Sequence, residues 1–304
     1  MTDFTSASTY RLEGTGVAVI TPFRKDHSLD KEAFEQLVDH LLGAGIDFIV
    51  ALGTTAETPT LSIQEQKIIL DIAHRQCRTH RKLLVGGWGG NATEALMDRL
   101  DQLPYEQCDA LLSVTPYYNK PNQRGLIAHF TRLADDAPAP LILYNVPGRT
   151  GIDMDVPTIL ELAQHPNIIG IKEASGNVIK QLELLRRAPA DFAILSGDDA
   201  LALPQMAMGM QGIISVAANA YPASFSQMIR YARDGELPSA QRIHYQMLPI
   251  LHALFEEGNP TGIKALLAHQ GRIENVLRLP LVSASPALQQ RLAHLHQAVN
   301  AVLS

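Results

Sequence analysis

The amino-acid sequence predicts an α/β protein: a (β/α)8 TIM barrel followed by a C-terminal helical extension. The first observation is a rhythm of eight short apolar runs that alternate with amphipathic stretches, which is typical of parallel strands connected by helices. The second is the turn from Thr21 to Phe23 after the first run, which lacks the glycines that a doubly wound sheet would want. The third is that the last part of the chain shows helical patterns only.

The eight runs are short, continuous and rich in Ile, Val and Leu, as strands buried on both faces are. Their length and the helical patterns between them favour strands over buried helices. They are Gly16–Thr21, Asp47–Gly53, Leu83–Gly86, Ala110–Thr115, Leu141–Val146, Ile168–Ala174, Phe192–Gly197 and Gly212–Ala217.

Between the runs, apolar residues recur at helical spacing. From Phe34 to Leu42 they fall on one face, and Gly43 directly afterwards predicts the end of that helix. Ser62, with Glu65 three residues later, has the capping-box pattern that opens another helix.

The chain divides into two expected parts. The barrel would use residues 1–235, and a C-terminal helical bundle would use residues 236–304. The expected helices of this bundle are Ser239–Glu257, Thr261–His269 and Pro286–Leu303.

Composition argues against several classes of function. The 304 residues are 46% apolar, enough for a large core, and carry a net charge of −6 from 25 basic and 31 acidic side chains. Because there is no basic block, nucleic acid is not expected as a partner. The 11 histidines show no HxH or HExxH spacing, so no metal site is expected.

Nothing in the sequence predicts a membrane or secreted location. No segment approaches the roughly 18 uninterrupted apolar residues of a membrane span. The Ser/Thr-rich start, Met1 to Tyr10, lacks the apolar segment of a signal peptide. Cys77 and Cys108 form no CxxC pair, which favours a reduced chain. We therefore expect a cytoplasmic protein.

Lys172 is the most informative residue, because it lies inside the apolar run Ile168–Ala174. Lysine is rarely buried without a partner or a task, and burial favours its neutral amine, a nucleophile that forms Schiff bases with ketones. The alternatives are a snorkelling lysine or an ion pair with Glu173. Neighbouring strand residues point to opposite faces, so the intrastrand pair has poor geometry.

Polar and aromatic residues gather where the predicted strands end, which is the active-site end of a TIM barrel. Each also has an ordinary structural interpretation. The tyrosines can be packing aromatics and Arg149 a solvated turn residue. Thr54 and Thr55 either cap a helix or form a carboxylate cradle. Asp198 and Asp199 either cap loops or disfavour a phosphorylated substrate. The full set is Thr54, Thr55, Tyr117, Tyr118, Tyr144, Arg149, Lys172, Asp198 and Asp199.

Five motifs occur together: Gly53–Glu57, Thr115–Pro121, Tyr144–Gly151, Gly170–Ala174 and Leu195–Asp199. This combination resembles the dihydrodipicolinate synthase family of the pyruvate-dependent class I aldolase superfamily. The resemblance extends from Gly14 to the C-terminal helices. The paired threonines and the Arg149 turn distinguish this family from the sialate lyases, which share the lysine strand.

The resemblance implies that Lys172 forms a Schiff base with pyruvate and that the enamine adds to L-aspartate 4-semialdehyde. Tyr144 would act as general acid and base together with Thr54 and Tyr118. In the family, the tyrosine that matches Tyr118 enters the neighbouring subunit's site. A homodimer, or a homotetramer built as a dimer of dimers, is therefore implied. No cofactor is implied, because the protonated imine is the electron sink.

The same resemblance implies substrate-binding roles. Thr55 would hold the pyruvate carboxylate with Thr54, and Arg149 would clamp the semialdehyde carboxylate, which a guanidinium can bind bidentately. Further residues match positions that line the pocket or support the site: Gly197, Asp198, Ile214 and Asn259.

The chain departs from the family pattern in two places. Ala56 replaces the usual glycine, which is costly only if its φ is positive. Ile63 and Gln66 stand where lysine-inhibited members carry histidines, whereas Asn91 and Tyr117 of that allosteric pocket are kept. We therefore expect weak or absent feedback by lysine, with Asn91 and Tyr117 as allosteric candidates.

Two other functions stay open. One is another pyruvate-dependent enzyme of the superfamily, of the N-acetylneuraminate lyase or 2-keto-acid aldolase type, in which Arg149 would matter less. The other is a non-catalytic barrel, in which Lys172, Tyr144, Thr54 and Tyr118 would be under no chemical demand.

Overall fold

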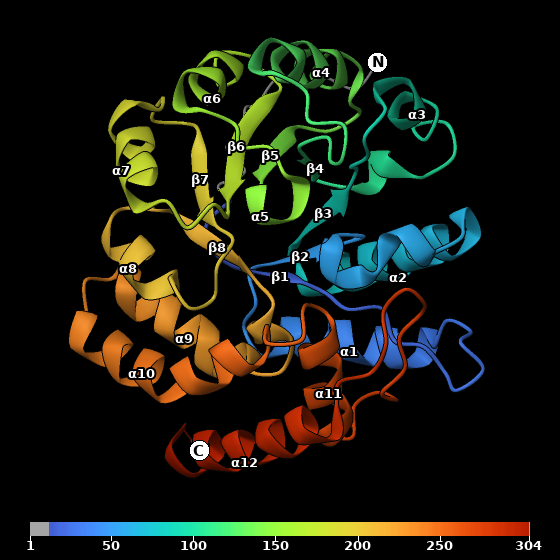
Figure 1. The fold of residues 1–304 in the computed structure, drawn as a ribbon, viewed down its shortest axis with the longest axis vertical. Coiled ribbons are helices and arrows are strands. Elements are labelled where there is room, and N and C mark those ends of the chain that lie inside the picture. The colour runs from blue at the N-terminus through green and yellow to red at the C-terminus, as the bar shows by residue number, and fades with distance from the viewer. Residues whose placement is uncertain (1–11, 304) are drawn as a thin grey trace.

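Eight parallel strands form a closed barrel in the order β1 to β8, with β1 paired to β8 (Figure 1). The structure is a computed structural model that describes residues 12–303, so the Ser/Thr-rich Met1–Tyr10 segment lies outside the described residues. The predicted (β/α)8 barrel is confirmed. The strands are β1 Gly14–Ala18, β2 Phe48–Ala51, β3 Leu83–Gly87, β4 Ala110–Val114, β5 Leu141–Asn145, β6 Ile168–Glu173, β7 Ala193–Ser196 and β8 Gly212–Ser215.

Helices connect successive strands and surround the barrel (Figure 1). The helix α1 ends at Gly43 as predicted, and α2 begins with the predicted capping box of Ser62 and Glu65. The helices between the strands are α1 Lys31–Gly43, α2 Ile63–His80, α3 Thr93–Met97, α4 Gln123–Asp136, α5 Pro147–Thr150, α6 Val156–Leu162, α7 Val178–Arg187 and α8 Ala202–Ala207, and α9 Pro222–Arg233 follows β8.

Two hydrophobic clusters flank the barrel wall. The larger lies between strands and helices, and the smaller fills the barrel interior with side chains such as Phe48, Val50, Leu195 and Ile214. Gly16 makes room in this interior, because a Cβ on it would lie 2.1 Å from the Phe48 ring. The interior is therefore a packed core, on top of which the carboxyl ends of the strands can carry a site.

Three further helices follow the barrel: α10 Leu237–Ala253, α11 Thr261–His269 and α12 Pro286–Leu303. The helix α10 packs against α9, and α12 packs against both α10 and α11 (Figure 1). The expected boundary at residue 235 falls in the connection between α9 and α10. The division of the chain into a barrel domain, 1–235, and a C-terminal helical bundle, 236–304, stays a prediction. Within residues 12–303, no helix combines the length and hydrophobicity that a membrane crossing requires.

Candidate active site

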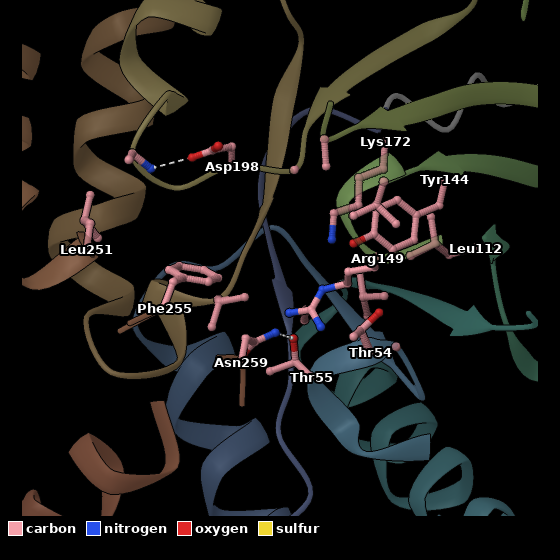
Figure 2. Close-up of a pocket in the computed structure, with 18 of the residues that line it drawn as sticks. Thr54, Thr55, Leu112, Tyr144, Arg149, Lys172, Asp198, Leu251, Phe255 and Asn259 are labelled. Atoms are coloured by element: carbon pink, nitrogen blue, oxygen red, sulfur yellow. Dashed lines mark hydrogen bonds between the residues drawn. The ribbon is translucent and has the colours of Figure 1, made fainter. Parts of the chain in front are cut away.

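A cavity of about 380 Å³ opens at the carboxyl ends of the strands. It brings together eight of the residues that the sequence nominated, from both the barrel and the C-terminal extension (Figure 2). These are Thr54, Thr55, Tyr144, Arg149, Lys172, Gly197, Asp198 and Asn259.

Lys172 and Tyr144 lie side by side on neighbouring strands. They are register partners in the β5–β6 ladder, and their exposed fractions are 5% and 7%. The Lys172 Nζ lies 4.4 Å from the centre of the Tyr144 ring. Among the described residues, no carboxylate oxygen lies within 4.0 Å of this Nζ. The amine is therefore buried, unpaired by any described carboxylate, and placed at the cavity wall, as a nucleophile requires.

Glu173, the alternative partner of Lys172, points to the other side of β6. Its carboxylate lies 3.4 Å from the Nζ of Lys180 on α7 and accepts a hydrogen bond from Asn145. The intrastrand ion pair is therefore excluded.

Gly197 supplies the space that the lysine occupies. A Cβ at this position would lie 3.0 Å from Cε of Lys172 and 2.6 Å from Cβ of Ala174. Such contacts are too close for a side chain other than hydrogen. Glycine is thus required here for the packing of the lysine, without any demand on its φ.

Thr54 and Thr55 lie directly after β2, in a short 3-10 helix, Thr54–Ala56. Thr55 is buried, and its Oγ1 accepts a hydrogen bond of 3.0 Å from Nδ2 of Asn259 (Figure 2). Asn259 Oδ1 is buried at the cavity and has no hydrogen-bond partner in the described part of the chain. The left-handed φ of +55° falls on Glu57 and not on Ala56, so the departure from glycine carries no backbone strain.

Arg149 belongs to α5, a single turn that follows β5. Its guanidinium reaches the cavity near Thr54 (Figure 2). No carboxylate within residues 12–303 lies within 4.0 Å of it, so the cation is free to bind an anionic ligand. The solvated-turn interpretation is incomplete, because the side chain lines the cavity.

Asp198 and Asp199 both act as caps, as the structural interpretation predicts. Asp198 Oδ1 accepts hydrogen bonds from the backbone N–H groups of Ala200 and Leu201, and Asp198 also lines the cavity. Asp199 accepts from two N–H groups after β8, and burial raises the pKa of its carboxyl to about 6. Ile214 is in the barrel interior cluster and is not among the lining residues.

Besides Ile214, three further nominated residues, Tyr117, Tyr118 and Asn91, are not among the residues that line the cavity of their own chain. Tyr118 is 88% exposed and has a left-handed φ of +76°. Tyr117 is 39% exposed, and the carbonyl oxygen of Asn91 accepts a hydrogen bond from Asn119 at the surface. The structure therefore does not bring Tyr118 together with Lys172 within one chain.

Sequence reasoning missed three cavity residues at the end of α10: Leu251, His252 and Phe255. The one sequence feature that could have pointed to these three residues is their position shortly before Asn259. They show that the C-terminal extension forms one wall of the site.

Neither a metal cluster nor a reactive thiol is found among the described residues. No group of three or more His, Cys, Asp or Glu side chains among residues 12–303 could hold a metal ion. Burial raises the pKa of both Cys77 and Cys108 to about 12, which keeps these thiols unreactive.

The comparisons with known proteins agree on one family. The family model described as "Dihydrodipicolinate synthetase family" matches residues 11–299. A curated relative from Parabacteroides distasonis, named 4-hydroxy-tetrahydrodipicolinate synthase, is 46% identical and covers 89% of this chain and 91% of its own.

Solved structures of the same family superpose closely. The 4-hydroxy-tetrahydrodipicolinate synthase of Methylacidiphilum fumariolicum has a TM-score of 0.92 at 35% identity and covers 96% of this chain and 97% of its own. The dihydrodipicolinate synthase of Acinetobacter baumannii, solved in complex with pyruvate, has a TM-score of 0.92 at 36% identity and covers 95% of this chain and 99% of its own. The chain belongs to the dihydrodipicolinate synthetase family and is an enzyme of the lyase class.

Proposed function

We propose that this chain condenses pyruvate with L-aspartate 4-semialdehyde through a Schiff base on Lys172. This is the reaction of a 4-hydroxy-tetrahydrodipicolinate synthase, the first committed step of diaminopimelate and lysine biosynthesis. The observation that carries the proposal is the buried amine of Lys172, unpaired by any described carboxylate, beside Tyr144. The names of the curated relatives support this reaction over that of another pyruvate-dependent aldolase.

The chemistry follows from the positions of the groups. The Lys172 amine adds to the ketone carbon of pyruvate, and loss of water gives an imine. Loss of a methyl proton gives an enamine, whose carbon attacks the aldehyde of the second substrate. The amine of that substrate then attacks the imine carbon and releases Lys172. Tyr144 is the group that donates and accepts these protons, because its ring lies against the lysine.

The two carboxylates of the substrates have separate sites in this proposal. Thr54 and Thr55 hold the pyruvate carboxylate with their hydroxyl and backbone N–H groups, close to Lys172. Arg149 binds the carboxylate of the semialdehyde, which is consistent with its lack of a described carboxylate partner. Gly197, Asp198 and Asn259 line the same cavity.

Tyr118 is assigned to the proton relay of a neighbouring subunit. Its exposed fraction of 88% supports this assignment, since a tyrosine so exposed is available to a second copy. The active form would be a homodimer or a homotetramer. Analytical ultracentrifugation that finds a fully active monomer contradicts this assignment.

The test is a coupled assay with pyruvate, L-aspartate 4-semialdehyde, the next reductase and NADPH. Pyruvate-dependent oxidation of NADPH should disappear in Lys172→Ala. In Arg149→Ala, the semialdehyde reaction should collapse, while borohydride should still trap pyruvate on Lys172. Absence of turnover by the wild-type enzyme, with pyruvate still trapped, rejects the acceptor and directs the search to sugar acids and other aldehydes.

We place the reaction in the cytoplasm.

Feedback inhibition by lysine is proposed to be weak or absent. Gln66 is buried, and its amide donates a hydrogen bond to the carbonyl of Leu61. Because an amide does not ionise, Gln66 cannot replace a histidine as an ionisable contact. Asn91 and Tyr117 remain as the candidate lysine contacts. An inhibition constant in the low micromolar to sub-millimolar range contradicts this proposal.

A further inference from the structure

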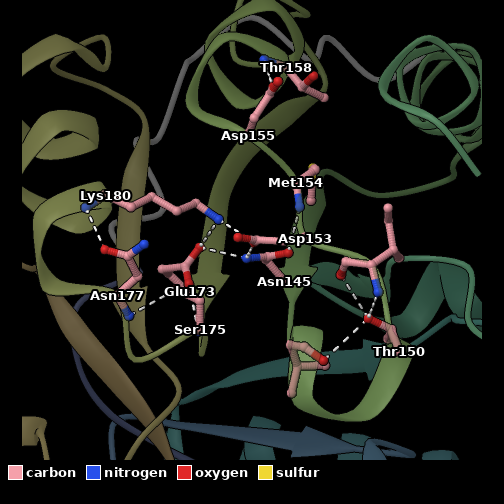
Figure 3. A network of polar contacts seen from close by, with 12 residues as sticks. Asn145, Thr150, Asp153, Met154, Asp155, Thr158, Glu173, Ser175, Asn177 and Lys180 are labelled. Atoms are coloured by element: carbon pink, nitrogen blue, oxygen red, sulfur yellow. Dashed lines mark hydrogen bonds and ion pairs between the residues drawn. The ribbon is translucent and has the colours of Figure 1, made fainter. Parts of the chain in front are cut away.

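A buried polar network lies directly behind the catalytic pair (Figure 3). Asn145 and Glu173 follow Tyr144 and Lys172 on β5 and β6, and they are register partners in the same ladder. Because side chains alternate along a strand, these two point away from the barrel interior. Both are fully buried, with exposed fractions of 0%.

The Asn145 amide connects β5 to β6 and to the segment after α5. Its Nδ2 donates to Oε2 of Glu173 at 2.9 Å and to Oδ1 of Asp153 at 2.7 Å. Its Oδ1 accepts from the backbone N–H of Met154 at 3.0 Å. This side chain therefore ties three segments at once.

Lys180 on α7 completes the network. Its Nζ lies 2.5 Å from Asp153 Oδ1 and 3.4 Å from Glu173 Oε2 (Figure 3). The other carboxylate oxygen of Glu173 accepts from the N–H of Ser175 at 2.6 Å. Burial of a glutamate carboxylate without such partners would cost free energy. Here both oxygens of Glu173 have partners, so the network is hydrogen-bonded as a buried carboxylate requires.

We propose that Glu173, Asn145 and Lys180 are positioning residues that hold Lys172 against Tyr144 and anchor the turn that carries Arg149. Each network residue on a strand is the chain neighbour of a reacting residue, so a shift of one moves the other. The Arg149 turn lies between Asn145 and Asp153, and the network fixes both of its ends. This inference rests on the proposed function of Lys172.

The test separates the rate of imine formation from its final extent. Pyruvate is trapped on the full-length enzyme with borohydride over time, and the adduct is measured by mass spectrometry. Glu173→Gln and Lys180→Met should slow trapping roughly 10²-fold, the effect of a misplacement of about 1 Å, while the final extent stays at the wild-type value. The KM for the semialdehyde should rise, because the Arg149 turn loosens. Lys180→Arg, which keeps the cation, should recover most of the rate.

Glu183→Gln is the matched control. Glu183 also lies on α7 and pairs with Arg186, but on the exposed surface, so its trapping rate should equal that of the wild type. If Glu173→Gln does not fold, Glu173→Gln/Lys180→Met removes both buried charges together, and the same slow trapping is expected.

Two results would overturn the inference. One is a wild-type trapping rate in Glu173→Gln with only a lowered melting temperature, which assigns the network to stability alone. The other is equal amide hydrogen exchange at the ends of β5 and β6 in Glu173→Gln and Glu183→Gln, whereas faster exchange in Glu173→Gln supports the positioning role. Because exchange is measured without pyruvate, it tests the inference even if the wild-type enzyme traps no pyruvate, a result that contradicts the proposed function.

Discussion

Replacement of Lys264 by methionine should destabilise the fold by about 3–5 kcal/mol, because it leaves a buried carboxylate without its cation. Lys264 lies on α11, and its Nζ is 2.6 Å from Oε1 of Glu57, with both side chains 0% exposed. Among the described residues, the other oxygen of Glu57 accepts one hydrogen bond, from the N–H of Arg278 at 3.0 Å. Burial lowers the pKa of Lys264 to about 8 although Glu57 acts in the opposite direction, which indicates strong desolvation.

The assay is urea unfolding at pH 7 and constant protein concentration, with a double variant beside the single one. Glu57→Gln/Lys264→Met buries no charge at this site and should be more stable than Lys264→Met by several kcal/mol. Because Glu57 follows Thr54–Ala56 directly, Lys264→Met should also raise the KM for pyruvate. A Lys264→Met variant within about 1 kcal/mol of wild type, or a double variant less stable than the single one, refutes the reasoning.

The matched control is an exposed ion pair. Lys82 and Asp47 are 3.4 Å apart, with side chains 32% and 36% exposed. Because water screens this pair, Lys82→Met should lower the free energy of unfolding by less than about 1 kcal/mol.

Three other substitutions test the site and its surroundings. Gly197→Ala should slow pyruvate trapping roughly 10²-fold, since its Cβ would lie 3.0 Å from Cε of Lys172 and displace the amine. Burial raises the pKa of Asp199 from 3.8 to about 6, so the folded protein keeps a proton that the unfolded chain loses. The protonated carboxyl thus contributes about 3 kcal/mol to the free energy of unfolding, and this contribution is lost as the pH rises through 6. In Asp199→Asn, the free energy of unfolding should change less with pH between pH 4 and 6. Arg278 lowers the pKa of Glu65 from 4.5 to about 2, so stability from this pair is lost as the pH falls through that range, and Glu65→Gln should remove this acid dependence in circular-dichroism titrations.

The barrel and the reacting residues could be predicted because they depend on local patterns and on one topological rule. Eight apolar runs with helices between them have few closed arrangements, and parallel strands bring their carboxyl ends together. This rule placed Lys172 and Tyr144 in one site, although 27 residues separate them in the chain. The motif after β2 likewise placed Thr54 and Thr55 at the same rim.

Strand ends were predicted less well. The run Gly212–Ala217 was expected to be one strand, but β8 ends at Ser215 and a 3-10 helix begins at Ala217. The reason is that hydrophobicity reports burial, and the chain stays buried after it leaves the sheet.

The long-range polar contacts could not be predicted. Glu57 and Lys264 are 207 residues apart, and no periodicity connects them. The same holds for the wall that His252 and Phe255 add to the cavity, which depends on how α10 packs on the barrel. Tertiary packing decides these contacts, and a single sequence does not encode their pairing in any local pattern.

The contrast among the buried lysines gives the strongest physical argument for the identity of the nucleophile. Three lysines within residues 12–303 are buried: Lys172, Lys180 and Lys264. The Nζ of Lys180 and the Nζ of Lys264 each lie within 3.4 Å of a carboxylate oxygen of a buried glutamate. Lys172 has no such partner among the described residues and faces the Tyr144 ring and the cavity instead. A lysine that pairs with a buried carboxylate serves the structure, whereas a lysine without such a partner at a cavity is available to attack a carbonyl carbon. The glutamates that pair with Lys180 and Lys264 directly follow Lys172 and the Thr54–Ala56 turn in the chain, so in our proposal two buried lysines support the site and the third carries out the chemistry.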